Sequence, residues 1–154
     1  KYISAKMAET NAVIGGESSG GLAVRGHIAG KDGIYAAALL VEMLAVTGKS
    51  VSQLYQEITD KYGMLYYEDA AFTMTQARKV ELQEKLFVKL EVPDFGNAVE
   101  KINRTDGCKV YFTDGSWVIC RFSGTEPLLR MAAEGESQSQ ARTYIRIWRE
   151  ELGL

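Results

Sequence analysis

CKVYFTDGSWVICRF, residues 108–122, decides the fold class of the second half of this chain. Two runs rich in aromatic and β-branched residues flank Asp114-Gly115, and such a dipeptide between two such runs is the strongest short-range signal for a β-hairpin. The two strands of a hairpin lie side by side and antiparallel. The stretch therefore predicts an antiparallel sheet from about Val99 onward.

The hairpin also predicts where the only two cysteines of the chain point. A two-residue turn would pair Cys108 with Arg121 and Lys109 with Cys120, so that the cysteines face opposite sides of the sheet and form no disulfide. Neither cysteine belongs to a CxxC pattern or lies near a zinc-binding set with the single histidine, His27. We therefore expect free thiols, a reducing compartment such as the cytoplasm, and no metal site in this chain.

The segments around the hairpin predict two further strands and two amphipathic helices. Residues 64–74 are aromatic and strand-like, and residues 128–136 alternate apolar with polar or small residues. Residues 75–90 have the pattern of an amphipathic helix. Its leucines at four-residue spacing are Leu82, Leu86 and Leu90. The closing helix begins with a capping box of Ser137 and Gln140. Its apolar stripe consists of Ala141, Tyr144, Ile145, Trp148 and Leu152.

The first part of the chain has a different pattern. Residues 11–17 predict a short buried strand that ends in glycines, as strands before functional loops of α/β domains do. Residues 33–48 are apolar nearly all round, with Asp32 as the N-cap, and predict a helix packed on a sheet that is mostly missing from this chain. Residues 50–63 predict a second, amphipathic helix.

Composition limits the classes of function. The 154 residues are 46% hydrophobic and carry a net charge of −2, so a real core is expected, and neither nucleic acid nor an anionic membrane is expected as a partner. No apolar run reaches about 18 residues and no signal peptide is recognisable. The chain begins at Lys1 without methionine, and we expect it to be part of a longer protein.

The first candidate site is GESSGG, residues 16–21. Glycines on both sides permit a tight loop and close approach by a ligand. The carboxylate of Glu17 can accept two hydroxyl protons, and serines such as Ser19 can both donate and accept. The segment fits a loop that binds a polyol, and it equally fits an ordinary turn with a solvated glutamate.

The second candidate site is RFSGTEPLLR, residues 121–130. Arg121 offers a bidentate fork, and Ser123 and Thr125 offer hydroxyl donors. Gly124 allows successive backbone N–H groups to turn toward one anion. The composition is that of a phosphate cradle, and the alternative is a polar loop that ends at Pro127.

The two loops together resemble the α-D-phosphohexomutases, the phosphoglucomutase and phosphomannomutase family. The resemblance rests on GGESSGG and RGHIAGKDGI, followed about a hundred residues later by RFSGTEPLLRMAAEGE, and covers essentially the whole chain. It implies an α/β fragment, residues 1–66, from the end of the third mutase domain. Residues 67–154 would be the complete fourth domain, a TATA-binding-protein-like α+β fold with an antiparallel sheet and helices on one side.

The resemblance also implies roles for single residues. Glu17 and Ser19 would bind sugar hydroxyls. The phosphate that is not being transferred would be bound by Arg121, Ser123, Gly124 and Thr125. Further candidate substrate contacts are Lys1, His27 and Arg130, and the expected strand pattern does not fix which way Arg130 faces. By itself, His27 fits a general acid or base as well as a structural hydrogen bond.

The activity implied is the interconversion of hexose 1-phosphate and hexose 6-phosphate, with phosphoglucomutase preferred. Phosphomannomutase, phosphoglucosamine mutase and a non-catalytic sugar-phosphate-binding module remain open, because the hexose substrates differ at C2 and these loops read other positions. Glucose 1,6-bisphosphate would be the intermediate and activator, and Mg²⁺ the cofactor. The phosphoserine and magnesium loops of the family lie in N-terminal domains outside this sequence. We therefore expect the chain alone to be inactive.

Overall fold

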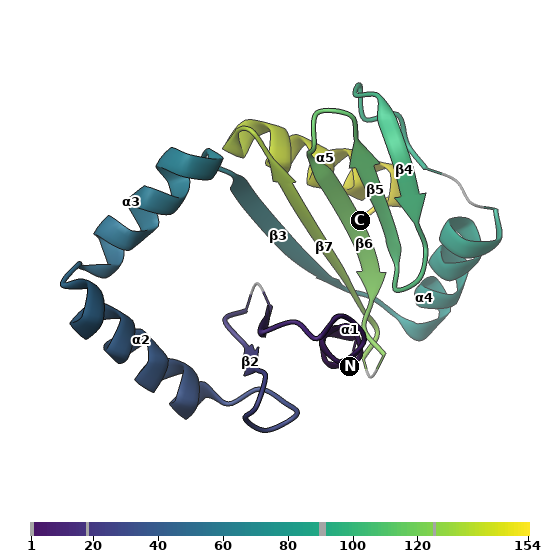
Figure 1. Ribbon diagram of the computed structural model, residues 1–154. Coiled ribbons are helices and arrows are strands. Elements are labelled where there is room, and N and C mark those ends of the chain that lie inside the picture. Colours follow the sequence, from purple (N-terminus) through teal and green to yellow (C-terminus); the bar gives the residue numbers. More distant parts are fainter. Residues whose placement is uncertain (1, 18, 90–91, 125) are drawn as a thin grey trace. The chain divides into compact units, whose positions relative to one another are not determined.

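The computed structural model describes residues 2–17, 19–89, 92–124 and 126–154 (Figure 1). It divides into two compact units, an N-terminal unit that ends at Tyr62 and a C-terminal unit, Gly63–Leu154. The expected order of a small α/β part followed by an α+β domain with an antiparallel sheet is confirmed. The boundary after Tyr66 stays a prediction.

The N-terminal unit contains a short hairpin and three helices. Its elements are α1 (Tyr2–Thr10), β1 (Ile14–Gly16), β2 (Leu22–Val24), α2 (Gly33–Thr47) and α3 (Val51–Tyr62). Helix α1 was not predicted from the sequence. This helix is followed by Asn11, which has a φ of 52°, and it packs so closely on Gly15 that a Cβ there would lie 2.5 Å from Met7 Sδ. Glycine at this position therefore makes room for α1.

The predicted cap of α2 is confirmed. The side chain of Asp32 accepts hydrogen bonds from the backbone N–H groups of Ile34 and Tyr35, both at 3.0 Å. Gly48 follows the helix with a φ of 66°, a left-handed conformation that glycine adopts without strain. The apolar run and its capping residues thus located both ends of this helix correctly.

The strand predicted for residues 11–17 was expected to be buried, and that prediction is wrong. Ala23 is the only described apolar residue of the N-terminal unit that is buried. Apolar side chains of α2 are also open, with Ile34 86% and Val46 79% exposed. A two-stranded hairpin is too small to cover a helix that is apolar on every side. The described residues of this unit therefore form no core that buries the apolar side chains of α2.

The C-terminal unit contains one five-stranded antiparallel sheet in the order β3-β7-β6-β5-β4. The strands are β3 (Tyr66–Thr73), β4 (Val99–Asn103), β5 (Cys108–Phe112), β6 (Trp117–Phe122) and β7 (Leu128–Gly135). The helices are α4 (Gln76–Gln83), the π-helical turn η1 (Glu84–Val88) and α5 (Gln138–Leu152).

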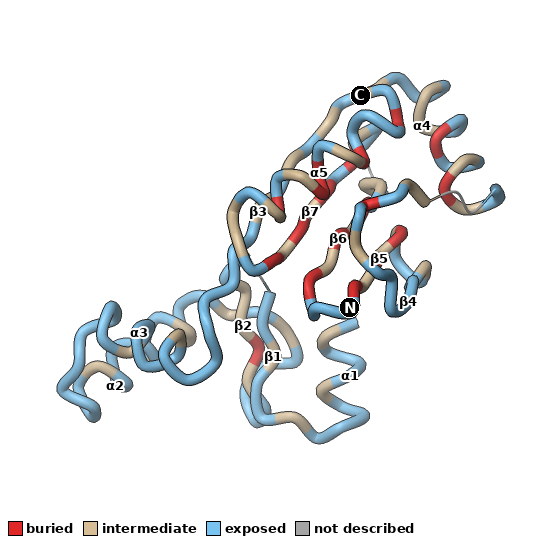
Figure 2. Tube along the Cα trace, turned by 90° about the horizontal axis from the view of Figure 1, so that it is seen from above, coloured by how far each residue is buried: buried red, intermediate tan, exposed pale blue. Residues whose placement is uncertain are grey.

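The core of this unit lies between one face of the sheet and the helices. Alternate residues of β5, β6 and β7 are buried, and they form one cluster with Leu82, Leu86 and the predicted apolar stripe of α5. Figure 2 shows the buried positions concentrated on these elements. The period of two along the strands and the stripe along α5 therefore identified the core correctly.

The register predicted for the β5–β6 hairpin is wrong by one residue. Cys108 pairs with Cys120, and both side chains are completely buried as free thiols. The loop has three residues rather than two, because the N–H of Phe112 donates to the carbonyl of Ser116 (2.9 Å). Gly115, with a φ of 86°, is the left-handed residue that such a three-residue loop requires. The expected free thiols are confirmed, but the cysteines share one face.

Two helix details also differ from the sequence analysis. The helix predicted for residues 75–90 is α-helical only to Gln83 and continues as η1; Leu90 lies outside the described residues. At the start of α5, Ser137 Oγ accepts the N–H of Gln140 as predicted (3.2 Å), but Gln140 Oε1 accepts the N–H of Glu136 (2.8 Å) instead of that of Ser137. The capping box is therefore only half formed.

Candidate functional site

The first candidate loop joins β1 to β2 in the N-terminal unit. The N–H of Glu17 donates to the carbonyl of Gly21, and the N–H of Gly20 donates to the carbonyl of Glu17, both at 2.9 Å. Gly20 has a φ of 85°, which side-chain-bearing residues rarely adopt. The loop is a closed turn on which Glu17 and Ser19 are exposed, while Ser18 lies outside the described residues.

A lysine that the sequence analysis did not single out holds the carboxylate of this loop. Lys31 Nζ lies 2.9 Å from Glu17 Oε2, and the hydroxyl of Ser19 donates to the same oxygen at 3.4 Å. The hydrogen bond from Lys31, together with its charge, lowers the pKa of Glu17 below the ordinary value. An ionised, exposed carboxylate can accept hydroxyl protons, as the predicted sugar contact requires.

The segment that carries Lys31 is fixed by neighbouring contacts. His27 Nε2 lies 2.8 Å from Asp32 Oδ2, and the ring of His27 stacks on Tyr35 with centroids 4.1 Å apart. The hydrogen bond from His27, followed by that from the N–H of Tyr35, lowers the pKa of Asp32. A Cβ on Gly21 would lie 2.3 Å from Lys31 Cδ, so this glycine leaves space for the lysine stem. The described contacts of His27 are thus structural, and its role toward a substrate stays a prediction.

The second candidate loop joins β6 to β7 in the C-terminal unit. The N–H of Ser123 donates to the carbonyl of Leu128 (2.8 Å), which closes the loop at its base. The N–H of Met74, at the end of β3, donates to the carbonyl of Pro127 (3.0 Å). This loop is therefore tied to the sheet on both sides. Of the residues expected here, Thr125 lies outside the described ones, as does Lys1 in the other unit.

The register of β6 and β7 settles the direction of Arg130, which the sequence left open. Arg121 and Arg130 are direct partners across the two strands, and both are exposed. Their neighbours Cys120, Leu129 and Met131 are buried, so the arginines lie on the face opposite the core. Like charges directly opposite each other are unfavourable in a sheet, and an anion between them would remove that cost.

One carboxylate already contacts this arginine pair. Asp106 Oδ2, in the turn between β4 and β5, lies 3.3 Å from Arg121 Nε. Both side chains are about half exposed, so the ion pair contributes little to stability. The arginine fork therefore remains available to an anion that competes with Asp106.

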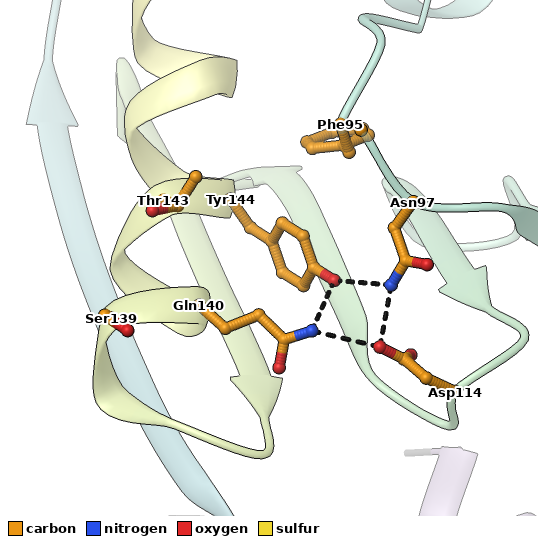
Figure 3. A pocket seen from close by; sticks show the side chains of 8 residues that line it. Phe95, Asn97, Asp114, Ser139, Gln140, Thr143 and Tyr144 are labelled. Carbon is orange, nitrogen blue, oxygen red and sulfur yellow. Dashed lines mark hydrogen bonds between the residues drawn. The ribbon is translucent and has the colours of Figure 1, made fainter.

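The C-terminal unit also has a hollow of about 430 Å³ that is lined by no described residue of the β6–β7 loop. Figure 3 shows polar side chains of Asn97, Asp114, Gln140 and Tyr144 gathered there. The side-chain amides of Asn97 and Gln140 each donate to Asp114 Oδ2 and to the hydroxyl of Tyr144, at 2.7 to 3.0 Å. Each amide thus uses both of its protons within the cluster, which indicates that these groups join α5 to the β5–β6 turn rather than bind a ligand.

The described part of the chain contains neither a cluster of metal-ligating side chains nor a single membrane-spanning helix. No group of three His, Cys, Asp or Glu side chains there could hold a metal ion. No single helix in these residues is long and apolar enough to cross a membrane; α2 and α3 pass that test only together, across a bend of 83°.

Comparisons with known proteins agree with this division of the chain. The family model described as phosphoglucomutase/phosphomannomutase, alpha/beta/alpha domain III, matches residues 1–62. The model described as phosphoglucomutase/phosphomannomutase, C-terminal domain, matches residues 73–147. Each candidate loop therefore lies within one matched domain.

Curated relatives carry names of the same family. The chain is 35% identical over 152 residues to the phosphoglucomutase/phosphomannomutase of Thermococcus kodakarensis, covering 99% of this chain and 30% of that protein. It is 29% identical over 144 residues to the phosphoglucosamine/phosphogalactosamine mutase of Sulfurisphaera tokodaii, covering 93% of this chain and 30% of that protein. The chain thus spans about 30% of the length of these relatives.

Solved structures show the same fold. A phosphoglucomutase/phosphomannomutase family protein from Burkholderia thailandensis superposes with a TM-score of 0.69 at 24% identity, over 97% of this chain and 30% of that one. The open form of the phosphoglucomutase parafusin from Paramecium gives a TM-score of 0.65 at 22% identity, over 99% of this chain and 32% of that one. Sequence and fold agree that the chain belongs to the phosphoglucomutase/phosphomannomutase family of phosphohexomutases.

Proposed function

We propose that this chain is the substrate-binding part of a phosphohexomutase that interconverts hexose 1-phosphates and hexose 6-phosphates. In this proposal Glu17 and Ser19 bind sugar hydroxyls, and the β6–β7 loop binds the phosphate that is not being transferred. The observation that carries it is the cross-strand pair of Arg121 and Arg130 beside a closed loop. Two guanidinium groups on one face of the sheet suit a phosphate, which offers several acceptor oxygens to charged donors.

The two loops would contribute to catalysis by positioning the substrate. Phosphoryl transfer depends mainly on alignment and on stabilising charge, so groups that touch no breaking bond can still accelerate the reaction. A hydroxyl clamp and a phosphate clamp would hold a hexose bisphosphate, such as glucose 1,6-bisphosphate, in either of two orientations. The hexose phosphate and the N-terminal mutase domains are the partners proposed for this chain.

The cofactor proposed for the complete enzyme is Mg²⁺. The described residues do not fit a magnesium site, because they contain no cluster of carboxylates that could hold the ion. The proposal therefore assigns the metal and the phosphoserine to parts of the longer protein, and assigns only substrate contacts to this chain.

Glucose 1-phosphate is the proposed preferred substrate, and the names of the relatives make mannose and glucosamine phosphates the alternatives. Kinetic assays of the complete enzyme on all three 1-phosphates with Mg²⁺ test this order. The highest kcat/KM on glucose 1-phosphate is expected. A preference for either of the other two would replace the substrate and leave the reaction class intact, whereas no turnover on any of them would contradict the proposal and favour a non-catalytic sugar-phosphate-binding module.

The chain of 154 residues alone is expected to give no mutase turnover, because it contributes neither the phosphoryl donor nor the metal site of the proposal. The same assay on the purified chain checks this expectation. Turnover that survives removal of contaminating enzymes would mean that the chain carries catalytic groups of its own.

A further inference from the structure

Lys79 of α4 contacts the β6–β7 loop from the helix side. Its Nζ donates to the carbonyl of Ser123 at 2.8 Å and to the carbonyl of Glu126 at 3.2 Å. These oxygens belong to residues 44 and 47 positions further along the chain. Lys79 is itself half-buried. One ammonium therefore fastens two points of the loop to a helix that the loop does not adjoin in sequence.

The surrounding backbone places α4 beside the loop. Thr73, the last residue of β3, pairs with Leu128, the first residue of β7, and the N–H of Met74 donates to the carbonyl of Pro127. Thr75 then caps α4 by accepting the N–H of Arg78 at 3.2 Å. The helix thus starts within two residues of the strand pair, and its first turn brings Lys79 to the loop.

The contact with Ser123 fixes the orientation of one peptide group. A trans peptide is planar, with its C=O and N–H pointing in opposite directions. Because the carbonyl of Ser123 points to Lys79, the N–H of Gly124 points away from α4. Backbone N–H groups that are free to converge bind anions, whereas carbonyl oxygens repel them. Holding the carbonyls on the α4 side therefore presents a donor on the other side.

We infer that Lys79 is a positioning residue of the phosphate loop, which sets the affinity for phosphate by orienting the loop backbone. The inference rests on the proposed function of that loop. It assigns Lys79 no contact with the ligand: the ammonium donates to two loop carbonyls and fixes the peptide between Ser123 and Gly124. A mobile loop would have to be ordered on binding, and ordering costs affinity.

Inorganic phosphate is the probe that tests this inference. We would titrate it into the ¹⁵N-labelled chain and follow the Gly124 amide by NMR, for the wild type and for Lys79→Met. The variant is expected to bind phosphate about 5-fold to 30-fold more weakly, in line with the loss of charge-assisted hydrogen bonds. The chemical shift of the Gly124 amide should also differ between the variant and the wild type without phosphate, because Lys79 no longer orients that peptide group.

Two matched variants separate positioning from mere charge or folding. Lys79→Arg can still donate to both carbonyls and should bind phosphate within about 3-fold of the wild type. Lys89→Met removes an exposed charge just after η1, where the backbone N–H of Lys89 donates to the carbonyl of Glu84, and should change binding less than about 2-fold. The thermal unfolding midpoint of each variant shows whether the C-terminal unit is folded. Lys79→Gln is a second variant without the ammonium, for use if Lys79→Met does not fold.

The outcomes are distinct. Wild-type affinity in a folded Lys79→Met or Lys79→Gln would overturn the inference, and so would a loss that disappears at high salt, since screening removes long-range attraction but not loop geometry. If the wild type itself binds no phosphate, or if Arg121→Ala binds as tightly, the proposed function of the loop fails and the inference fails with it. Weakened binding in Arg121→Ala but not in Lys79→Met would overturn the role of Lys79 alone.

Discussion

The two candidate loops differ in what holds them. The Glu17 loop is fixed by a short hairpin and an exposed ion pair to Lys31, in a unit with Ala23 as its only described buried apolar residue. The β6–β7 loop is fixed by a sheet with a full core and by Lys79. The comparison indicates that the β6–β7 loop lies on a scaffold with a packed core, whereas the described residues around the Glu17 loop form no comparable core.

The largest expected difference between the two units is the cost of truncating an apolar side chain. Phe112→Ala, in the core of the C-terminal unit, should lower the free energy of unfolding by about 3 to 5 kcal/mol. Val46→Ala, on the exposed face of α2, should change it by less than about 0.5 kcal/mol. Denaturant unfolding measures both. A Val46→Ala cost close to that of Phe112→Ala would show that α2 is packed in solution.

The second comparison separates the roles of the two loops in the complete enzyme. Arg121→Ala should lower kcat/KM by about 30-fold to 1000-fold, the equivalent of roughly 2 to 4 kcal/mol for a lost bidentate contact to phosphate. Arg121→Lys should recover only part, because an ammonium lacks the fork. Glu17→Ala should weaken discrimination among hexose phosphates. If it weakens inhibition by inorganic phosphate as much as Arg121→Ala does, the division into a sugar clamp and a phosphate clamp is wrong.

The third test concerns the polar cluster near the N-terminus of α5, whose contribution to stability should depend on pH. Partial burial raises the pKa of Asp114, but hydrogen bonds from Ser116, Asn97 and Gln140 outweigh that and hold it below the ordinary value. The ionised carboxylate thus stabilises the fold fully above pH of about 4, and this contribution is lost as the pH falls through the lowered pKa.

Asp114→Asn should therefore cost about 1 kcal/mol at neutral pH, a value reduced for the exposure of the group, and progressively less in acid. Denaturant unfolding from pH 7 to pH 3, with the wild type as reference, measures this. A difference that stays constant with pH would mean that the charge of Asp114 contributes nothing.

The smallest expected effect tests competition for the arginine fork. Asp106→Asn removes the carboxylate next to Arg121 and should increase phosphate affinity by about 2-fold, as expected for an exposed ion pair. Glu100→Gln, an exposed carboxylate of β4 that lies 3.8 Å from Lys101, is the matched control and should leave affinity unchanged. Weaker binding in Asp106→Asn would show that Asp106 orients Arg121 for the anion instead of competing with it.

The sequence predicted elements better than it predicted their alignment. Hydrophobic periodicity and capping residues located α2, α3 and α5, because each depends on neighbours within one or two turns. The register of β5 and β6 depended on whether the loop had two or three residues, and Asp114-Gly115 fits both. One residue of difference moved the cysteines onto the same face.

The candidate site shows the same limit. Residues within the two loops could be named from their own chemistry and from the family resemblance. Lys31 and Lys79 could not, because each acts on a segment distant in sequence and neither has a local pattern that marks it. The direction of Arg130 followed only once its strand partner was known. Contacts between distant segments are what a single sequence leaves undetermined.

The two free cysteines, Cys108 and Cys120, can report when the C-terminal unit unfolds locally. Burial raises the pKa of both thiols, so in the closed state Cys108 and Cys120 are poor nucleophiles and are shielded from reagents. Because they are the only cysteines in the sequence, a thiol reagent would label the chain only when the C-terminal unit opens. The labelling rate would measure how often that happens, and motion in the N-terminal unit would leave no trace in it.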